Sequence, residues 1–189
     1  AMPDDAMVST DIGNICQVAN SYLRFNQPRS MFGAMMFGNC GYAFPTMIGC
    51  KVGAPDRTAV AYVGDGAWGM SFGELLTCVR EKIPVTAVVF HNRQWGAEKK
   101  NQVDFYGNRF VGSNLENPSF ASIARAMGAE GIVVDKLAEV LLEQLDLLAE
   151  CAVRQVQLFG RSAQVGQPRH RAKHGQGVQG QADGGCRHL

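Results

Sequence analysis

Two short apolar runs rich in β-branched residues lie near the middle of the chain, joined by a segment of helical character. The first run, residues 59–63, stops at a GDG tripeptide, and the second, residues 85–90, stops just before Asn92. Runs of this length joined by an amphipathic helix predict a βαβ unit with parallel strands. A right-handed crossover places both strand ends on one edge of the sheet. We therefore expect Asp65 and Asn92 to lie close together, although 27 positions separate them.

The residues at these two strand ends have the chemistry of a metal–phosphate site. The Asp65 carboxylate and the Asn92 carboxamide offer the oxygen ligands that a hard divalent cation prefers. Gly64 and Gly66 let backbone N–H groups approach a phosphate, and a helix N-terminus is expected behind them. A GDG tripeptide alone is common turn chemistry. Its place between a strand and a helix, with Asn after the next strand, instead predicts a Mg²⁺–diphosphate site.

Composition and charge fit one globular domain. The chain has 189 residues, enough for one well-buried core with or without a tail, and 46% of them are hydrophobic. A net charge of +1 argues against a dedicated nucleic-acid surface. No stretch approaches about 18 apolar residues, so we expect no membrane span. Residues 1–11 show no signal-peptide pattern.

The cysteines have no arrangement typical of a metal site. The chain contains six of them, without a CxxC pair and without zinc-like spacing. We expect most of them to be buried thiols in a reducing cytoplasm. These residues are Cys16, Cys40, Cys50, Cys78, Cys151 and Cys186.

The remaining pattern extends the α/β unit on both sides, and we expect a parallel sheet flanked by helices over residues 1–149. Apolar periodicity predicts helices at 11–22, 119–127 and 136–149, a short strand at 131–134, and a further apolar stretch at 43–52. Residues 101–118 are polar and aromatic without a sustained period, which predicts a long loop. Loops of this length in compact domains are often functional.

The C-terminal segment, residues 150–189, has a different composition. It holds six Lys and Arg against two acids, together with seven glycines, seven glutamines and three histidines. Such a sequence buries too little apolar surface to offset the entropy of ordering, so we expect a disordered or aberrant tail. Its basic charge could suit nucleic acid, but it lacks interleaved aromatic residues, and we expect no nucleic-acid partner.

Longer motifs give a specific resemblance. GDG, an interval of 25 residues and then Asn is similar to the thiamine-diphosphate signature. Residues 1 to about 140 resemble the C-terminal cofactor-binding domain of thiamine-diphosphate enzymes of the acetolactate synthase and pyruvate oxidase superfamily. Three segments are most similar to the sulfoacetaldehyde acetyltransferase family: FGNCGYAFPT at 37–46, GDGAWGMS at 64–71 and HNRQWGAEKKNQVDFYGNRFVG at 91–112. Residues 1–149 would then be a thiamine-diphosphate and Mg²⁺ domain, a fragment of a larger enzyme.

This resemblance implies an activity and partners. Enzymes of that family convert sulfoacetaldehyde and phosphate to acetyl phosphate and sulfite, in cytoplasmic taurine degradation, and the full-length enzyme would be a homodimer or homotetramer. The activating Glu would lie in a separate N-terminal domain, so residues 1–149 would hold no catalytic acid and would be inactive alone. Two alternatives stay open: another thiamine-dependent lyase, carboligase or oxidase, and a non-catalytic cofactor-binding fragment. A nicotinamide site is disfavoured, because no GxGxxG follows a first strand.

The resemblance also assigns residues. The metal ligands would be Asp65, Asn92 and the main-chain carbonyl of Gln94. The implied cofactor contacts, beyond these three, are Gly13, Asn14, Gly38, Asn39, Cys40, Gly64, Gly66, Ala67, Trp68, Trp95 and Gly96. Lys99, Lys100 and Arg109 form a basic cluster that could bind the anionic substrates, sulfoacetaldehyde and phosphate.

Simpler interpretations stand beside several of these assignments. Asp11 could simply cap the helix that would contain Asn14. Cys40 occupies a position where relatives carry a bulky Met or Leu, and it could be a small buried hydrophobe. Trp68 could be a core residue, and exposed lysines are ordinary on protein surfaces.

Overall fold

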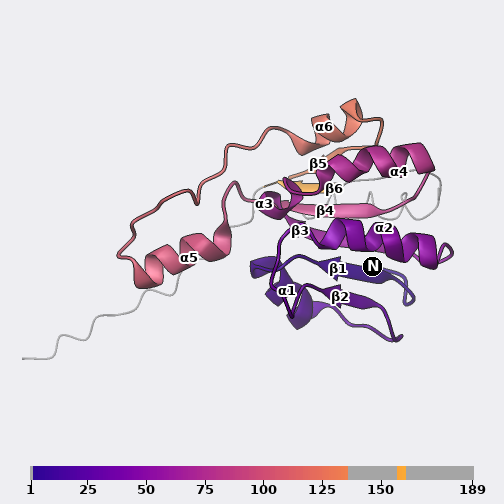
Figure 1. The fold of residues 1–189 in the computed structure, drawn as a ribbon, viewed down its shortest axis with the longest axis horizontal. Helices are drawn as coiled ribbons and strands as arrows, with labels where there is room; N and C mark the ends of the chain where they lie inside the picture. Colours follow the sequence, from indigo (N-terminus) through magenta and orange to yellow (C-terminus); the bar gives the residue numbers. More distant parts are fainter. Residues whose placement is uncertain (1, 136–156, 161–189) are drawn as a thin grey trace, which may run out of the picture.

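A six-stranded parallel sheet forms the centre of the molecule in this computed structural model, which describes residues 2–135 and 157–160 (Figure 1). The strand order is β2-β1-β3-β4-β6-β5, and every pair of neighbours is parallel. The strands are β1 (Met7–Thr10), β2 (Met31–Gly33), β3 (Ala59–Gly64), β4 (Thr86–His91), β5 (Ile132–Val134) and β6 (Gln157–Gly160). The expectation of a parallel sheet flanked by helices is confirmed.

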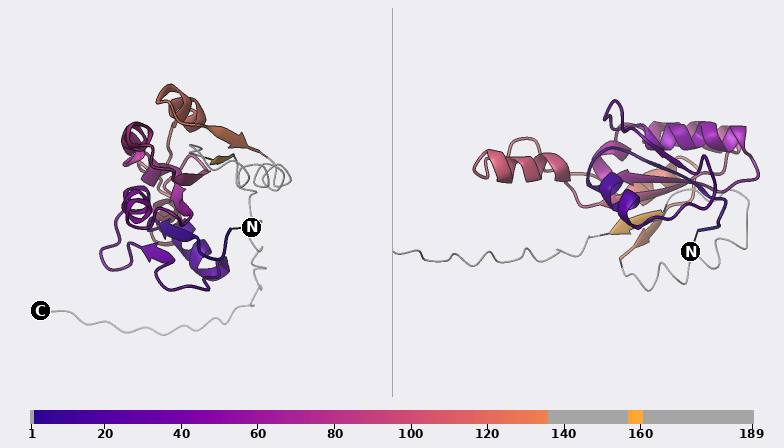
Figure 2. Two further views of the ribbon diagram at one scale, coloured as in Figure 1. Left: turned by 90° about the vertical axis from the view of Figure 1, so that its right-hand side faces the viewer. Right: turned by 90° about the horizontal axis from the view of Figure 1, so that it is seen from below.

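Helices lie on both faces of this sheet, as Figures 1 and 2 show. The helices α2, α4 and α6 cover one face, and α1 lies on the other, where it contacts β1 and β3. The helices are α1 (Asn14–Tyr22), α2 (Ala43–Gly53), α3 (Asp65–Trp68), α4 (Leu75–Glu81), α5 (Gly96–Phe105) and α6 (Phe120–Ala126), with a 3-10 turn at Phe72–Glu74. Among the described residues, none of these helices is long and apolar enough to cross a membrane.

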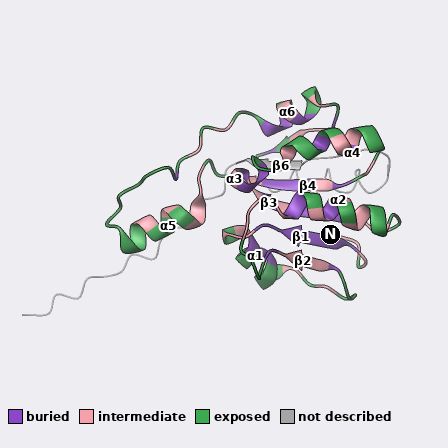
Figure 3. Cartoon of the chain, in the orientation of Figure 1, coloured by how far each residue is buried: buried purple, intermediate pink, exposed green. Residues whose placement is uncertain are grey.

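The core follows the two-residue period of the central strands. Ala61 and Val63 of β3 point to the face covered by α2 and α4, whereas Val60 points to the face that carries α1. The same alternation in β4 places Val89 in the first cluster and Val88 in the second. Both faces of β3 and β4 are largely buried, as the purple strands of Figure 3 show. Parallel strands covered on both sides explain the near-continuous apolar runs of the sequence.

The predicted βαβ unit is confirmed. Strands β3 and β4 pair in parallel, with Val60 opposite Thr86 and Gly64 opposite Phe90. The connection between them is more divided than expected, because α3 and the 3-10 turn precede α4. Asp65 therefore opens a short helix directly at the end of β3.

The first helix differs from the prediction at its start. It begins at Asn14, with Gly13 at the N-cap and no side-chain cap. Asp11, expected as a possible cap of this helix, instead reaches another helix: its Oδ1 accepts hydrogen bonds from the backbone N–H groups of Tyr42 (2.7 Å) and Ala43 (3.1 Å), at the start of α2. A carboxylate at a helix N-terminus satisfies donors that have no partner within the helix.

The prediction of a long loop over residues 101–118 is partly wrong. Its first five residues are helical and complete α5, and only the remainder is irregular. No residue of α5 is buried, and the helix projects away from the sheet edge (Figure 1). Its lack of an apolar face explains why hydrophobic periodicity did not reveal it. The predicted helix at 119–127 and strand at 131–134 are present as α6 and β5, and the helix expected at 136–149 lies outside the described residues.

One short segment of the C-terminal tail forms a strand, although the composition of the tail predicts disorder. Residues Gln157–Gly160 form β6, between β4 and β5, so that Leu158 pairs with both Val89 and Val133. The sequence of this strand, QLFG, contains two large apolar residues that the average composition of the tail conceals. The other tail residues, and the expected boundary at 149, lie outside the described part of the chain.

Asp11 gives a stability prediction. Its carboxylate is fully buried, and Oδ2 has no hydrogen-bond partner among the described residues. Substitution Asp11→Ala leaves two N–H groups of α2 without an acceptor, so it should lower the free energy of unfolding by about 1–3 kcal/mol. Asp11→Asn keeps an acceptor oxygen and should cost less. Denaturant unfolding of the chain measures both changes, and an Asp11→Ala variant as stable as the wild type would contradict the capping role.

The same variants test a pH dependence. Burial raises the pKa of Asp11 above its ordinary value of 3.8, and the hydrogen bonds from the start of α2 oppose this shift only in part. A raised pKa means that the folded state holds the proton more tightly, so this contribution to stability is complete below about pH 3.8 and is lost as the pH rises through the folded pKa. The stability of Asp11→Asn relative to the wild type should therefore increase from pH 4 to pH 7.

Candidate functional site

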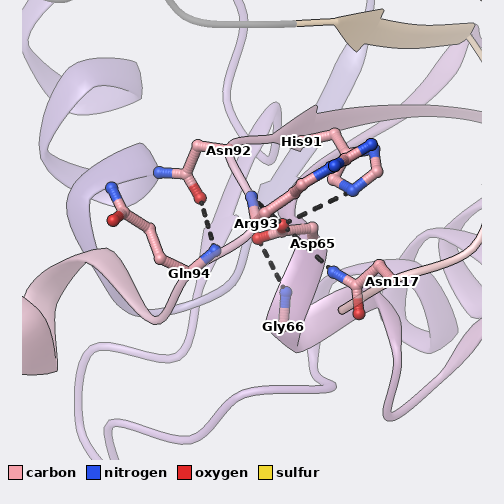
Figure 4. A network of polar contacts seen from close by, with 7 residues as sticks. All are labelled: Asp65, Gly66, His91, Asn92, Arg93, Gln94 and Asn117. Carbon is pink, nitrogen blue, oxygen red and sulfur yellow. Dashed lines mark hydrogen bonds and ion pairs between the residues drawn. The ribbon is translucent and has the colours of Figure 1, made fainter. Parts of the chain in front are cut away.

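Asp65 is the centre of a polar network at the carboxyl edge of the sheet (Figure 4). Its side chain is 2% exposed, and three donors surround it. Oδ1 accepts from the backbone N–H of Gly66 (3.0 Å), and Oδ2 accepts from the backbone N–H of Arg93 (2.6 Å) and from Nδ2 of Asn117 (3.1 Å). The carboxylate therefore joins the end of β3, the loop after β4 and the segment that contains Asn117.

The electrostatics of this network are those of a buried charge. Burial raises the pKa of Asp65, while the hydrogen bonds from Arg93, Gly66 and Asn117 and the nearby His91 lower it. The Nε2 atom of His91 lies 3.9 Å from Oδ2, beyond hydrogen-bond distance, and its ring packs against Phe120. Burial lowers the pKa of His91, which favours the neutral imidazole. Buried groups with shifted pKa values are typical of functional sites.

Asn92, in the loop after β4, lies near Asn14 at the start of α1. Both carboxamides face Gly96: a β-carbon on that glycine would lie 3.1 Å from Nδ2 of Asn14 and 3.5 Å from Nδ2 of Asn92. Asn14 is the first residue of α1 and Gly96 is the first residue of α5. The N-termini of these two helices therefore meet beside Asn92.

The two helix N-termini, of α1 and α5, together form a place suited to an anion. Neither α1 nor α5 has a side-chain cap, and the N-cap positions are held by Gly13, with φ of 121°, and by Trp95. Uncapped N-termini present N–H groups that favour a phosphate. The Asp65 carboxylate and the Asn92 carboxamide supply the hard oxygen donors that a divalent cation requires beside such an anion. The residues present therefore fit a cation–diphosphate group.

The backbone of the loop after β4, residues 92–95, is held by a second segment, residues 113–117, which we call the strap. The N–H of Trp95 donates to the carbonyl of Ser113 and the N–H of Leu115 donates to the carbonyl of Arg93, both at 2.9 Å. Gln94 forms the antiparallel bridge between these bonds, opposite Asn114, and its N–H donates to Oδ1 of Asn92 (3.2 Å). The carbonyl of Gln94, expected as a metal ligand, thus belongs to a fixed loop.

Arg93 adopts a left-handed backbone conformation within that loop, with φ of 57°. This conformation is uncommon for residues other than glycine and costs about 1–3 kcal/mol. The short hydrogen bond from its N–H to Asp65 helps to hold it. Strained residues of this kind cluster where a ligand is bound.

The glycines of the GDG motif have different surroundings. A β-carbon on Gly66 would lie 2.8 Å from the ring of Trp95, whereas a β-carbon on Gly64 would meet nothing within 4 Å. The Trp95 ring therefore covers Gly66. Ala67 and Trp68 follow in α3 and are buried. The ring of Trp68 packs edge-on against Phe44 at 4.9 Å, so its side chain belongs to the core.

The turn at residues 38–41 lies beside the start of α1. Gly38 and Gly41 have φ of 72° and 79°, values that favour glycine, and the first is open to solvent. Cys40 is half-buried, with Sγ 3.9 Å from the carbonyl oxygen of Ile12. Burial raises the pKa of the Cys40 thiol, and Asp11 and Glu98 raise it further. Asn39 is also half-buried in this turn.

The basic cluster lies on the projecting arm formed by α5 and its returning loop. Lys99 donates to Oδ1 of Asn114 (2.8 Å) and lies over the ring of Phe110, and Lys100 pairs with Asp104. Arg109 lies in the returning loop and has no ion-pair partner among the described residues. The structure does not bring these three cations into the Asp65 network.

Sequence reasoning missed two contributors to this site. Asn117 donates to Asp65 from the strap, and the only local signal was a polar residue before Pro118 and the α6 cap Ser119. His91 ends β4 beside the carboxylate, but nothing in a strand pattern distinguishes a histidine near an acid from one near solvent.

Comparisons with known proteins identify the family of this chain. The family model of the thiamine pyrophosphate enzyme C-terminal TPP-binding domain matches residues 11–153. A sulfoacetaldehyde acetyltransferase from Castellaniella defragrans is 74% identical over 140 residues, which are 74% of this chain and 23% of the relative. The acetolactate synthase large subunit of Parasynechococcus marenigrum is more distant, with 33% identity over 69% of this chain and 21% of its own.

A solved structure shares the fold. The thiamine diphosphate-dependent 4-hydroxybenzoylformate decarboxylase of Rhodococcus jostii RHA1 superposes with a TM-score of 0.77 over 85% of this chain and 30% of its own, at 21% identity. At that identity the likeness concerns the fold alone. The chain spans about a quarter of the length of the curated relatives that it matches.

The contact between Gly66 and Trp95 gives a prediction for the site. Gly66→Ala should displace the Trp95 ring, because three ring atoms lie where the methyl group must go. Gly64→Ala is the matched control, since its backbone is extended (φ −78°) and the space is open. Tryptophan fluorescence of the chain should change for Gly66→Ala and remain near the wild-type spectrum for Gly64→Ala. Identical spectra for all three proteins would show that the ring does not cover the glycine in solution.

Proposed function

The chain belongs to the thiamine pyrophosphate enzymes, as their C-terminal TPP-binding domain, and from this we propose that the Asp65 edge binds the diphosphate of thiamine diphosphate through Mg²⁺. Asp65, Asn92 and the carbonyl of Gln94 would hold the cation. The observation that carries the proposal is the meeting of two uncapped helix N-termini beside Asn92 and the buried carboxylate. An anion and a cation together satisfy both kinds of group.

The other proposed contacts surround this centre. Gly13 and Asn14 would meet the diphosphate at the start of α1, and Ala67 and Trp68 would donate backbone N–H groups to it. Gly64, Gly66 and Gly96 would let the main chain approach the cofactor, with Trp95 packed beside it. The turn containing Gly38, Asn39 and Cys40 would support the cofactor between its two rings.

We propose further that this domain is part of a sulfoacetaldehyde acetyltransferase, which converts sulfoacetaldehyde and phosphate to acetyl phosphate and sulfite. The relatives with this name are far more similar to the chain than the acetolactate synthases are. When bound, thiamine diphosphate supplies an electron sink for bond cleavage beside a carbonyl. The residues of this chain bind and orient it.

Other parts of the enzyme would supply groups that this domain lacks. None of the described glutamates lies in the Asp65 network, so we expect the acid that activates the cofactor to come from another domain, across the interface of a homodimer or homotetramer. Residues 1–149 form the cofactor domain in this proposal, and we place the enzyme in the cytoplasm. The four cysteines that the structure describes are free thiols, which suits a reducing compartment. Residues 1–149 alone should not turn over.

Arg109 remains the best candidate of the basic cluster for an anionic substrate. Lys99 and Lys100 are already engaged with Asn114 and Asp104, whereas the Arg109 guanidinium has no ion-pair partner among the described residues. A planar guanidinium suits a sulfonate or a phosphate.

The cation site is tested by binding. Asp65→Ala and Asn92→Ala should each weaken Mg²⁺-dependent binding of thiamine diphosphate to the chain. For Asp65 the loss should reach at least about 100-fold, the upper end of the cost typical of an outer-shell partner. Asp56→Ala, which removes an exposed carboxylate after α2, is the control and should bind like the wild type. Calorimetric titration measures all four affinities, and undiminished binding by Asp65→Ala would remove the basis of the site.

The reaction is tested on the full-length enzyme. Incubation with sulfoacetaldehyde, phosphate, thiamine diphosphate and Mg²⁺ should release sulfite and acetyl phosphate in equal amounts. Acetolactate formation from pyruvate, without sulfite release, would instead favour the carboligase alternative. An isolated 189-residue chain that cleaves sulfoacetaldehyde unaided would show that the catalytic groups are wrongly placed.

A further inference from the structure

The Asp65 carboxylate has few free positions left for a ligand. A carboxylate offers about four lone-pair directions, two on each oxygen. Oδ2 accepts two hydrogen bonds, from Arg93 and Asn117, and Oδ1 accepts one, from Gly66. Three donors therefore leave one direction open, and it lies on Oδ1.

Asn117 differs from the other two donors. Arg93 and Gly66 donate through the backbone, which a substitution does not remove. Asn117 donates through its side chain, from a segment 52 positions away in sequence. It is therefore the single replaceable group among the three that decides how many oxygens of Asp65 are available.

The strap fixes Asn117 relative to the loop after β4. Hydrogen bonds join Trp95 to Ser113 and Leu115 to Arg93, and both lie within four residues of Asn117. Figure 4 shows the Asn117 amide pointing at Asp65 on the side away from Asn92 and Gln94. The same short segment thus holds the loop that carries two proposed ligands and the carboxylate that is the third.

We infer that Asn117 is a positioning residue that restricts Asp65 to one oxygen toward the bound cation, and so favours Mg²⁺ over larger cations. The inference rests on the proposed cation site. Mg²⁺ demands a compact octahedral shell and is served by one oxygen of each carboxylate, whereas Ca²⁺ takes more ligands and accepts both oxygens of one carboxylate. With the Asn117 donor in place, Oδ2 is occupied and two-oxygen binding is blocked.

Removing the donor should change the preference between cations. In Asn117→Ala, one of the two occupied positions on Oδ2 becomes available, while the backbone N–H groups of Arg93 and Gly66 still hold the carboxylate. Mg²⁺ affinity should fall by about 10-fold or more, the cost typical of losing an outer-shell partner. Ca²⁺ affinity should fall much less, because a second oxygen then becomes available to it. The ratio of Mg²⁺ to Ca²⁺ affinity should therefore decrease.

The experiment compares cation titrations of the 189-residue chain in the presence of thiamine diphosphate. Mg²⁺ and Ca²⁺ are titrated separately into the wild type, Asn117→Ala and Asn117→Leu, and circular dichroism checks the fold of each protein. Asn117→Leu keeps the size and branching of the side chain without its N–H groups, so it separates the lost donor from lost packing. Asn114→Ala is the matched control, because Asn114 lies on the same strap and contacts Lys99 instead of Asp65.

The outcomes are distinct. A lower Mg²⁺ to Ca²⁺ ratio in both Asn117 variants, with Asn114→Ala at the wild-type ratio, supports the inference. An unchanged ratio in a folded Asn117 variant overturns the inference and leaves the proposed cation site in place. This holds also when both affinities fall equally, because an equal loss indicates only that the strap has loosened. A wild-type chain that binds neither cation would overturn the proposed function and this inference with it.

Discussion

A buried carboxylate must be surrounded by hydrogen-bond donors, and this requirement organises the functional edge of the molecule. Asp65 is almost inaccessible to solvent, and its donors come from its own helix, from the loop after β4 and from the strap. Leaving a charged group buried without such partners costs several kcal/mol. The carboxylate therefore holds three segments together through its hydrogen bonds, and these segments position the proposed ligands.

A parallel sheet makes it possible for these three segments to meet at Asp65. Because all six strands run the same way, their carboxyl ends and the helix N-termini that follow lie at one edge. Ligands of open α/β sheets bind at this edge. Here β1 leads to α1, β3 leads to Asp65, and β4 leads to Asn92 and α5. The polar residues gather there, while the alternating apolar residues of the same strands form the core.

The arm beyond this edge has a different character. Helix α5 buries no residue, and exposed apolar side chains on it and its returning loop include Phe105, Tyr106 and Val111. The arm is held internally, since Gln102 exchanges two hydrogen bonds with the backbone of Val111. The chain corresponds to about a quarter of its curated relatives. An internally ordered arm with exposed apolar groups is consistent with a domain that works beside other parts of an enzyme.

The sequence by itself determined the βαβ unit and the closeness of Asp65 to the loop of Asn92. Strand period, helix connection and crossover handedness are local or general rules, so they act without knowledge of the remaining fold. Only the tertiary structure decided the target of Asp11, the donor role of Asn117, the helical state of residues 101–105 and the place of β6 between β4 and β5. Each of these depends on which distant backbone or side chain lies opposite. Periodicity within one segment carries no information about that partner.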